Sequence, residues 1–237
     1  MERRAGTLQR SAVKAIGTDD FSAGEVLANG VRIWLTQLPA YACVAFVVHL
    51  PLLLLFLLRW LPGFLLVPIF FVAELVAALL VKAALTKAVL VARRGVSSDV
   101  REMLEALRQH APAVLGVGTR ILSAAGPKLL MLLLPGLAWL CETFAAVPAL
   151  VAEGASSAAA LRRSEQLIGG ARLRVFGVCA VIWALAWTLP FACGVHHQGV
   201  VTVGWMLVYL FTRALDTSLG AVLAATAYSH LLERPQA

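Results

Sequence analysis

Long apolar runs separated by short polar segments dominate the pattern of this chain. These runs predict helical membrane spans at residues 38–58, 64–91, 112–134, 137–152, 174–194 and 199–229. Most are close to the ~20 mainly apolar residues that a helix needs to cross a hydrocarbon core. Helix breakers cluster at residues 61–63, 135–136 and 194–199, which predicts a tight turn within each successive pair of spans.

An amphipathic segment with a serine at its start precedes each pair of spans. The three segments are FSAGEVLANGVRIWLTQLPAY, SSDVREMLEALRQHAPAV and SSAAALRRSEQLIGGARLRVF. In the first, Ser22 and Glu25 predict a capping box at the helix start. In the second, Val100, Met103 and Leu107 share one helical face, as in a helix that lies in the membrane surface. A plain surface loop is the competing interpretation for any one segment.

The predicted fold class is all-α. The elements indicate a polytopic membrane protein with about six transmembrane helices arranged as three hairpins, each preceded by an amphipathic interfacial helix. Residues 1–20 form a polar N-terminal segment, and residues 21–237 form a single membrane domain with units at about 21–93, 97–153 and 156–232. Residues 1–20 lack the apolar centre of a removable signal peptide, so the first span is expected to direct insertion.

Composition and charge narrow the class of protein and its orientation. Hydrophobic residues make up 60% of the chain and charged residues 14%, which excludes an ordinary soluble domain. Basic residues gather in the N-terminal segment and in the longer connections, which indicates that these parts and both termini are cytoplasmic. The expected location is the bacterial cytoplasmic (inner) membrane, with several passes. Attraction to anionic lipid accounts for the net charge of +7 without nucleic acid.

One block of the sequence resembles a known family. In LLLPGLAWLCETFAAVPALVAEGASSAAALRRSEQLIGGARLRVFGV, the resemblance is carried by Pro135-Gly136, Pro148, Glu153-Gly154, Arg163-Ser164 and residues 172–177. The opening FSAGEVLANGVRIW and the closing AATAYSHLLER add to it. The chain is similar to a bacterial membrane-domain family that also forms the membrane portion of some glycerophosphodiester phosphodiesterases. Glu165 stands where that family's pattern has an aromatic residue.

The resemblance implies an integral membrane protein linked to lipid metabolism or membrane integrity, and it supplies no catalytic residues. A phosphodiesterase would need a further domain with clustered His, Glu and Asp to hold a metal, and no such cluster occurs in this sequence. We therefore expect no enzyme activity, no metal and no cofactor. His49 is expected to hydrogen-bond a neighbouring helix rather than to act in catalysis.

Ionisable residues inside the predicted spans are the strongest functional lead, because such residues are costly and usually mark a bundle interior. They are Glu74, Lys82, Arg120, Lys128, Glu142, Arg213 and Asp216. Lys128 and Glu142 lie at similar distances from the predicted turn at residues 135–136, which predicts that they pair. Arg213 and Asp216 are three residues apart and can pair along one helix. Asp216 is also expected near Arg120, which would link the last span to the third.

Two functions remain open, with a third that lacks an identifiable site. The preferred one is a non-enzymatic protein that supports envelope or lipid homeostasis by binding anionic lipid or a partner protein at its cytoplasmic face. Its candidate contacts are Arg93, Arg94, Arg162, Arg163, Arg172 and Arg174, although these could serve only to set topology. The alternative is a transporter or permease subunit that uses buried carboxylates. The third is an intramembrane enzyme that acts on lipid. It would need a cluster of nucleophile, base and acid, and no such cluster can be assembled from the sequence. The possible partners, besides membrane lipids, are another membrane protein or a second copy of this chain.

Overall fold

The structure, a computed structural model, describes residues 21–58, 62–131, 139–192 and 203–233. Within these ranges every regular element is helical, which confirms the all-α prediction for them. The elements are α2 (Ala23–Thr36), α3 (Leu38–His49), the 3-10 helix η1 (Leu50–Leu58), α4 (Gly63–Ala92), α5 (Val100–Met131), α7 (Ala146–Glu153), α8 (Ser157–Ile168), α9 (Arg172–Ala192) and α10 (Val203–Leu232).

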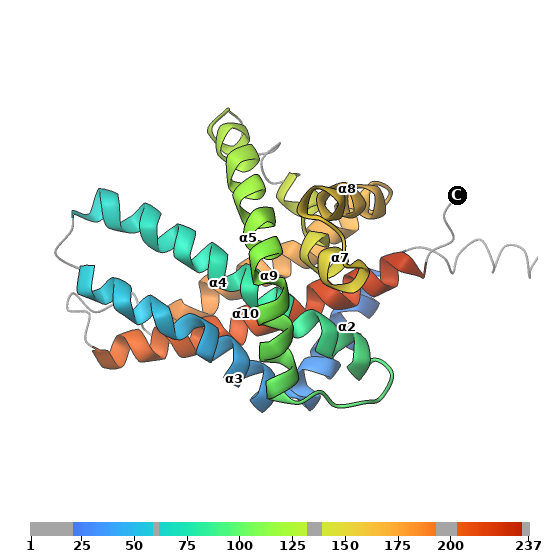
Figure 1. Cartoon of the computed structure of the whole chain (residues 1–237), viewed down its shortest axis with the longest axis horizontal. Coiled ribbons are helices and arrows are strands. Elements are labelled where there is room, and N and C mark those ends of the chain that lie inside the picture. Colours follow the sequence, from blue (N-terminus) through green and yellow to red (C-terminus); the bar gives the residue numbers. More distant parts are fainter. Residues whose placement is uncertain (1–20, 59–61, 132–138, 193–202, 234–237) are drawn as a thin grey trace, which may run out of the picture.

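Helix α10 is the centre of the assembly and packs against α2, α3, α4 and α9. Figure 1 shows α3, α4 and α10 running together toward one end of the molecule, while α5 crosses them. Small residues allow the close approach. A Cβ atom at Gly30 of α2 would lie 2.5 Å from Cδ2 of Leu223 on α10, so a larger residue here would require the Leu223 side chain to move.

Three helices are long and apolar enough to cross a membrane, judged by length and composition. They cover Leu38–Leu55, Phe64–Ala92 and Met206–Leu232, and they match the predicted spans at 38–58, 64–91 and 199–229. A fourth candidate is the pair α8 and α9, which is bent by 109° at the break between them. The described residues therefore contain three candidate spans, or up to four, and the predicted count of about six is not confirmed.

The described part of the third predicted span (112–134), residues 112–131, belongs to the long helix α5 rather than to a separate element. The second amphipathic segment and this predicted span form one continuous helix. The described part of that helix is not among the candidate membrane spans. One face of this helix is polar, and Arg101, Arg108, Thr119 and Arg120 are all exposed. The opposite face, including Val114 and Val117, is buried against the protein.

The fourth predicted span, residues 137–152, is interrupted. Residues 139–142 are helical, residues 143–145 form a turn, and α7 begins only at Ala146. Helix α7 packs against α4, α5 and α8, and residues 146–151 are buried by these neighbours. It ends at Gly154, whose φ of 64° is the left-handed conformation that favours glycine at a helix C-terminus. Its apolar character thus serves protein packing.

The first and third entry segments are helices, as predicted. Ser22 caps α2 by accepting a hydrogen bond from the Glu25 amide at 3.3 Å. The Glu25 carboxylate lies 3.4 Å from Nε2 of His230 on α10, so it links two helices instead of closing the predicted box. Ser156 caps α8 in the same way through the Ala159 amide.

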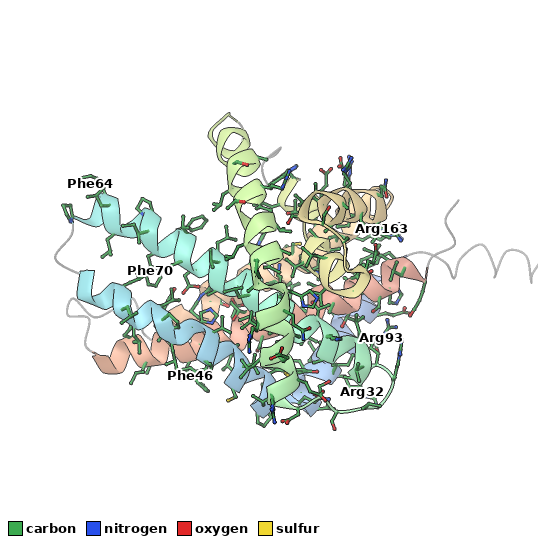
Figure 2. All side chains as sticks on the ribbon, viewed as in Figure 1. Arg32, Phe46, Phe64, Phe70, Arg93 and Arg163 are labelled. Carbon is green, nitrogen blue, oxygen red and sulfur yellow. The ribbon has the colours of Figure 1, made fainter. Side chains whose placement is uncertain are left out.

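The two ends of the molecule differ in surface chemistry. Large apolar side chains are exposed at the end where η1 stops and where α4 and α10 begin, with Phe64 at 76% and Phe71 at 64%. Figure 2 shows Phe46, Phe64 and Phe70 in this half, and Arg32, Arg93 and Arg163 in the other. Soluble proteins rarely expose so much contiguous apolar surface, which is typical of a region that contacts lipid.

Candidate functional site

A cluster of ionisable side chains lies where α3, α4 and α10 meet. Arg213 of α10 donates from Nε and from Nη2 to Oε2 of Glu74 on α4, each at 3.2 Å. Its Nη1 donates to Oδ2 of Asp216, one turn further along α10, at 2.9 Å. One guanidinium therefore bridges two carboxylates from two candidate spans, a geometry that suits the planar fork of arginine.

Tyr209 and His49 complete this cluster. The Tyr209 hydroxyl donates to Oε1 of Glu74 at 3.2 Å. Nδ1 of His49 lies 2.7 Å from the Ala45 carbonyl oxygen, and because a carbonyl can only accept, this nitrogen carries a proton. The other ring nitrogen, Nε2, lies 3.9 Å from Oε2 of Glu74. We call Glu74, Arg213, Asp216, Tyr209 and His49 the buried charge cluster.

The buried charge cluster is well shielded from solvent. The side chains of His49, Glu74 and Asp216 are buried, and that of Arg213 is 18% exposed. Glu74 follows Phe64 by ten residues, which places it about 15 Å along α4 from the exposed apolar end. If that end lies at one boundary of a ~30 Å hydrocarbon core, Glu74 lies near its middle. Charge–charge attraction is much stronger there than in water.

The structure brings together part of the predicted polar network. Arg213 pairs with Asp216 as the spacing predicted, but its interhelical partner is Glu74. Arg120 is exposed on the outer face of α5, away from the buried Asp216. The last span is therefore joined to the second predicted span rather than to the third, because α5 lies across the bundle instead of within it.

The remaining predicted intramembrane charges lie apart from the buried charge cluster. Glu142 pairs with Arg172 at the start of α9, with 3.0 Å between Oε1 and Nη2. The side chain of Lys128, its predicted partner, falls outside the described residues. The ammonium group of Lys82 lies 5.1 Å from the centre of the Phe144 ring, a cation–π contact in the packed interior.

The six predicted basic contacts have different surroundings. Arg93 pairs with Glu233 at 3.0 Å, and Arg163 pairs with Glu153 at 3.0 Å. Arg174 donates to the Phe21 carbonyl oxygen at 3.1 Å, and Arg172 is held by Glu142 as described above. Arg162 is exposed on α8, and Arg94 is exposed just after α4.

A groove brings three of these arginines together. It has a volume of about 780 Å³ and lies between the C-terminal ends of α4, α7 and α10 and the side of α8. Its lining includes Arg93, Arg94 and Arg163, with Glu153, Glu233, Tyr228 and Ser229 as the other polar residues. The Tyr228 hydroxyl donates to Oε1 of Glu153 at 2.8 Å, which fixes the carboxylate that neutralises Arg163. We call this feature the arginine groove.

Two members of the buried charge cluster were not predicted from the sequence. Tyr209, Arg213 and Asp216 are spaced i, i+4 and i+7, so they share one face of α10, and this spacing could have identified Tyr209. The contact of His49 with Glu74 depends on how α3 packs against α4. No local pattern in the sequence carries that information.

No family model, curated protein or solved structure matches this chain. The resemblance to the phosphodiesterase-related membrane family therefore stays a prediction. Across the described part of the chain, no three His, Cys, Asp or Glu side chains are grouped so that they could hold a metal ion.

Proposed function

We propose that the protein is a multi-pass membrane protein that binds the phosphate headgroup of an anionic lipid in the arginine groove. The observation that carries this proposal is the convergence of Arg93, Arg94 and Arg163 on one groove beside the polar ends of two candidate spans. An anionic headgroup at the membrane surface would meet basic side chains at this level. Such a protein would support lipid or envelope homeostasis without catalysing a reaction.

Arg93 and Arg94 are the two residues best placed to bind the phosphate. The Glu233 side chain that pairs with Arg93 is 62% exposed, and an exposed ion pair contributes only ~0–1 kcal/mol, so a phosphate can replace it. Arg94 is exposed, and among the described residues no carboxylate is paired with it. Arg163 is already neutralised by Glu153, which gives it a role in shaping the groove.

The charge of the groove favours an anion. Three arginines and two glutamates in its lining give a net charge of +1, since 3 − 2 = 1. The C-terminal ends of α4, α7 and α10 add partial negative charge, which disfavours anions. Binding therefore depends on the arginine side chains, and removal of two of them would leave the lining with a net charge of −1.

We infer four crossings for the chain, made by α3 with η1, α4, α9 and α10. The support is the length and apolar character of these helices, with α8 as the interfacial part of the bent pair. The basic end of the molecule would face the cytoplasm, and with it both termini, in a bacterial inner membrane. An even number of crossings agrees with both termini on one side. Helix α5 would lie across the cytoplasmic half of the bundle.

The double variant Arg93→Gln/Arg94→Gln should lose anionic lipid. A loss of ~1 kcal/mol for each cation near the surface predicts about a 30-fold weaker affinity for phosphatidylglycerol or cardiolipin. Native mass spectrometry of protein purified in mild detergent measures the retained lipid. The matched control is Arg108→Gln/Arg120→Gln, which removes two exposed arginines of α5 that do not line the groove. Equal lipid retention in both double variants would reject the proposal.

A second candidate function is solute transport, favoured by the buried charge cluster inside the candidate spans. Transporters use intramembrane carboxylates to couple proton movement to that of a solute. If this protein works so, Glu74→Gln or Asp216→Asn should abolish a pH-dependent flux in proteoliposomes, whereas Arg108→Gln should leave it unchanged. Normal flux in both cluster variants would exclude the cluster from transport.

A further inference from the structure

The charges of the buried charge cluster do not balance. Glu74 and Asp216 are carboxylates, Arg213 is a cation, and Tyr209 is a phenol. With neutral His49 the sum is −1, since one guanidinium offsets only one of two carboxylates. An uncompensated charge in a largely buried, apolar region is costly, so the cluster has a strong requirement for one further positive charge.

His49 is the group that can supply this charge. Its Nδ1 donates to the Ala45 carbonyl oxygen, which leaves the lone pair on Nε2, the ring nitrogen next to Glu74. Nε2 is buried and has no hydrogen-bond partner in the described part of the chain. A protonated imidazole at this place would have two N–H groups and two oxygen acceptors, the Ala45 carbonyl and Oε2 of Glu74. The geometry therefore matches an imidazolium–carboxylate pair.

We propose that Nε2 of His49, facing Glu74, is a proton-binding site in the interior of the membrane domain. Proton uptake forms one N–H bond at Nε2, with the proton supplied by water and no other bond broken in the protein. It changes the charge of the buried charge cluster from −1 to zero. Loss of this proton from His49 restores the charge of −1 beside the ion pair of Arg213 and Glu74, which links α10 to α4.

The groups that act on this proton come from three helices. Glu74 of α4 favours the imidazolium, and Arg213 of α10 opposes it. Tyr209 and Asp216 of α10 contact Glu74 and Arg213 respectively, and so act on His49 through them. Burial, the largest of these influences, disfavours the imidazolium, whereas the Ala45 carbonyl oxygen and the Glu74 carboxylate favour it. No further ionisable side chain faces His49 from the described residues of these helices.

A proton fits the site better than a metal cation. Hard monovalent and divalent cations prefer several oxygen ligands, and Oδ1 of Asp216 is the carboxylate oxygen of the cluster that lacks a hydrogen-bond partner. The atom nearest to Glu74 is instead an imidazole nitrogen, which is a strong proton acceptor close to neutral pH. This site adds a proton-binding group to the proposed transport function. Only its biological use rests on that function, because a proton can bind at equilibrium without any transport.

The test is a pH titration of ¹⁵N-histidine-labelled protein in lipid nanodiscs, followed by NMR. His49→Gln identifies the His49 ring signals among those of the other histidines. In the wild type, His49 should change from one ring N–H to two as pH falls, with Nδ1 protonated throughout. In Glu74→Gln, the midpoint of this change should fall by ~1–3 pH units, the usual effect of removing an adjacent opposite charge.

Tyr209→Phe is the matched control, since it removes a hydrogen bond to Glu74 but no charge. Its midpoint should move by much less than that of Glu74→Gln. An equal midpoint in wild type and Glu74→Gln would overturn the proposal. So would a wild-type His49 signal that keeps one ring N–H over the whole pH range in which the protein stays folded, an outcome that does not depend on the folding of Glu74→Gln. A midpoint that falls when sodium replaces choline in the buffer would assign the site to a metal cation instead.

Discussion

Replacing Arg213 with methionine should destabilise the protein by about 3–5 kcal/mol, the usual cost of removing one partner from a buried ion pair. The side chain of methionine is apolar and unbranched, so the loss reflects charge rather than a steric clash. Glu74 and Asp216 would then remain buried without the guanidinium that pairs with both of them. The free energy of unfolding in mixed micelles, obtained by titration with sodium dodecyl sulfate, measures the effect.

The triple variant Glu74→Gln/Arg213→Met/Asp216→Asn separates charge from packing. Removing all three charges should recover most of the stability, because no unpaired charge stays behind. Arg120→Met, at an exposed position of α5, should change the unfolding free energy by less than about 0.5 kcal/mol. A small effect of Arg213→Met would show that the carboxylates are solvated. The burial of the charge cluster from water would then be contradicted.

Ser164→Ala should destabilise the protein by about 2–4 kcal/mol, although only one oxygen atom is removed. The Ser164 hydroxyl is buried, donates to the Glu142 carbonyl oxygen at 2.5 Å and accepts from the Ala145 amide at 3.2 Å. Its loss leaves two backbone groups without partners, at ~1–3 kcal/mol for each buried one. The same micelle titration measures the change.

Ser123→Ala is the control for this effect. The Ser123 hydroxyl also bonds a backbone carbonyl, that of Arg120, but it is exposed on α5 and water can replace the bond. Its removal should be close to neutral. If both serine variants behaved alike, Ser164 would not hold the turn at residues 143–145 to α8. The adjacent residues Arg163 and Ser164 thus have different partners. Arg163 pairs with Glu153, and Ser164 accepts a hydrogen bond from the turn at residues 143–145.

The sequence predicted three of the long apolar helices. Residues 38–58, 64–91 and 199–229 are long and hydrophobic, and the candidate spans of the structure fall in the same places. The cap of α2 by Ser22 was also predictable, because a cap depends only on residues within one turn. These features are local, and local patterns carry the information that specifies them.

The third and fourth predicted spans are not confirmed, and the described parts of both share one feature. Many of their apolar residues are buried by neighbouring helices of the protein, as Val114, Val117 and Leu150 show. Hydrophobicity alone cannot distinguish burial by protein from burial by lipid. The exposed Arg101, Arg108 and Arg120 were the available signal that α5 has a polar outer face.

The candidate site was predictable only along α10. The spacing of Arg213 and Asp216 on one helix indicated their pairing, and the structure has it. The choice of Glu74 over Arg120 as the interhelical partner depends on which helices pack together, and the proximity of His49 depends on the register between α3 and α4. Both are tertiary properties. A single sequence contains no pattern that reports them.

The central claim is that the apolar half of this bundle lies in lipid and the basic half in water. Spin labels test it directly, in nanodiscs, on a background with Cys43, Cys141, Cys179 and Cys193 replaced by alanine. Labels at exposed positions 54 and 71 should be relaxed by dissolved oxygen and shielded from a water-soluble nickel chelate, and labels at exposed positions 87 and 108 should show the reverse. Equal access of the nickel chelate to all four positions would contradict the account.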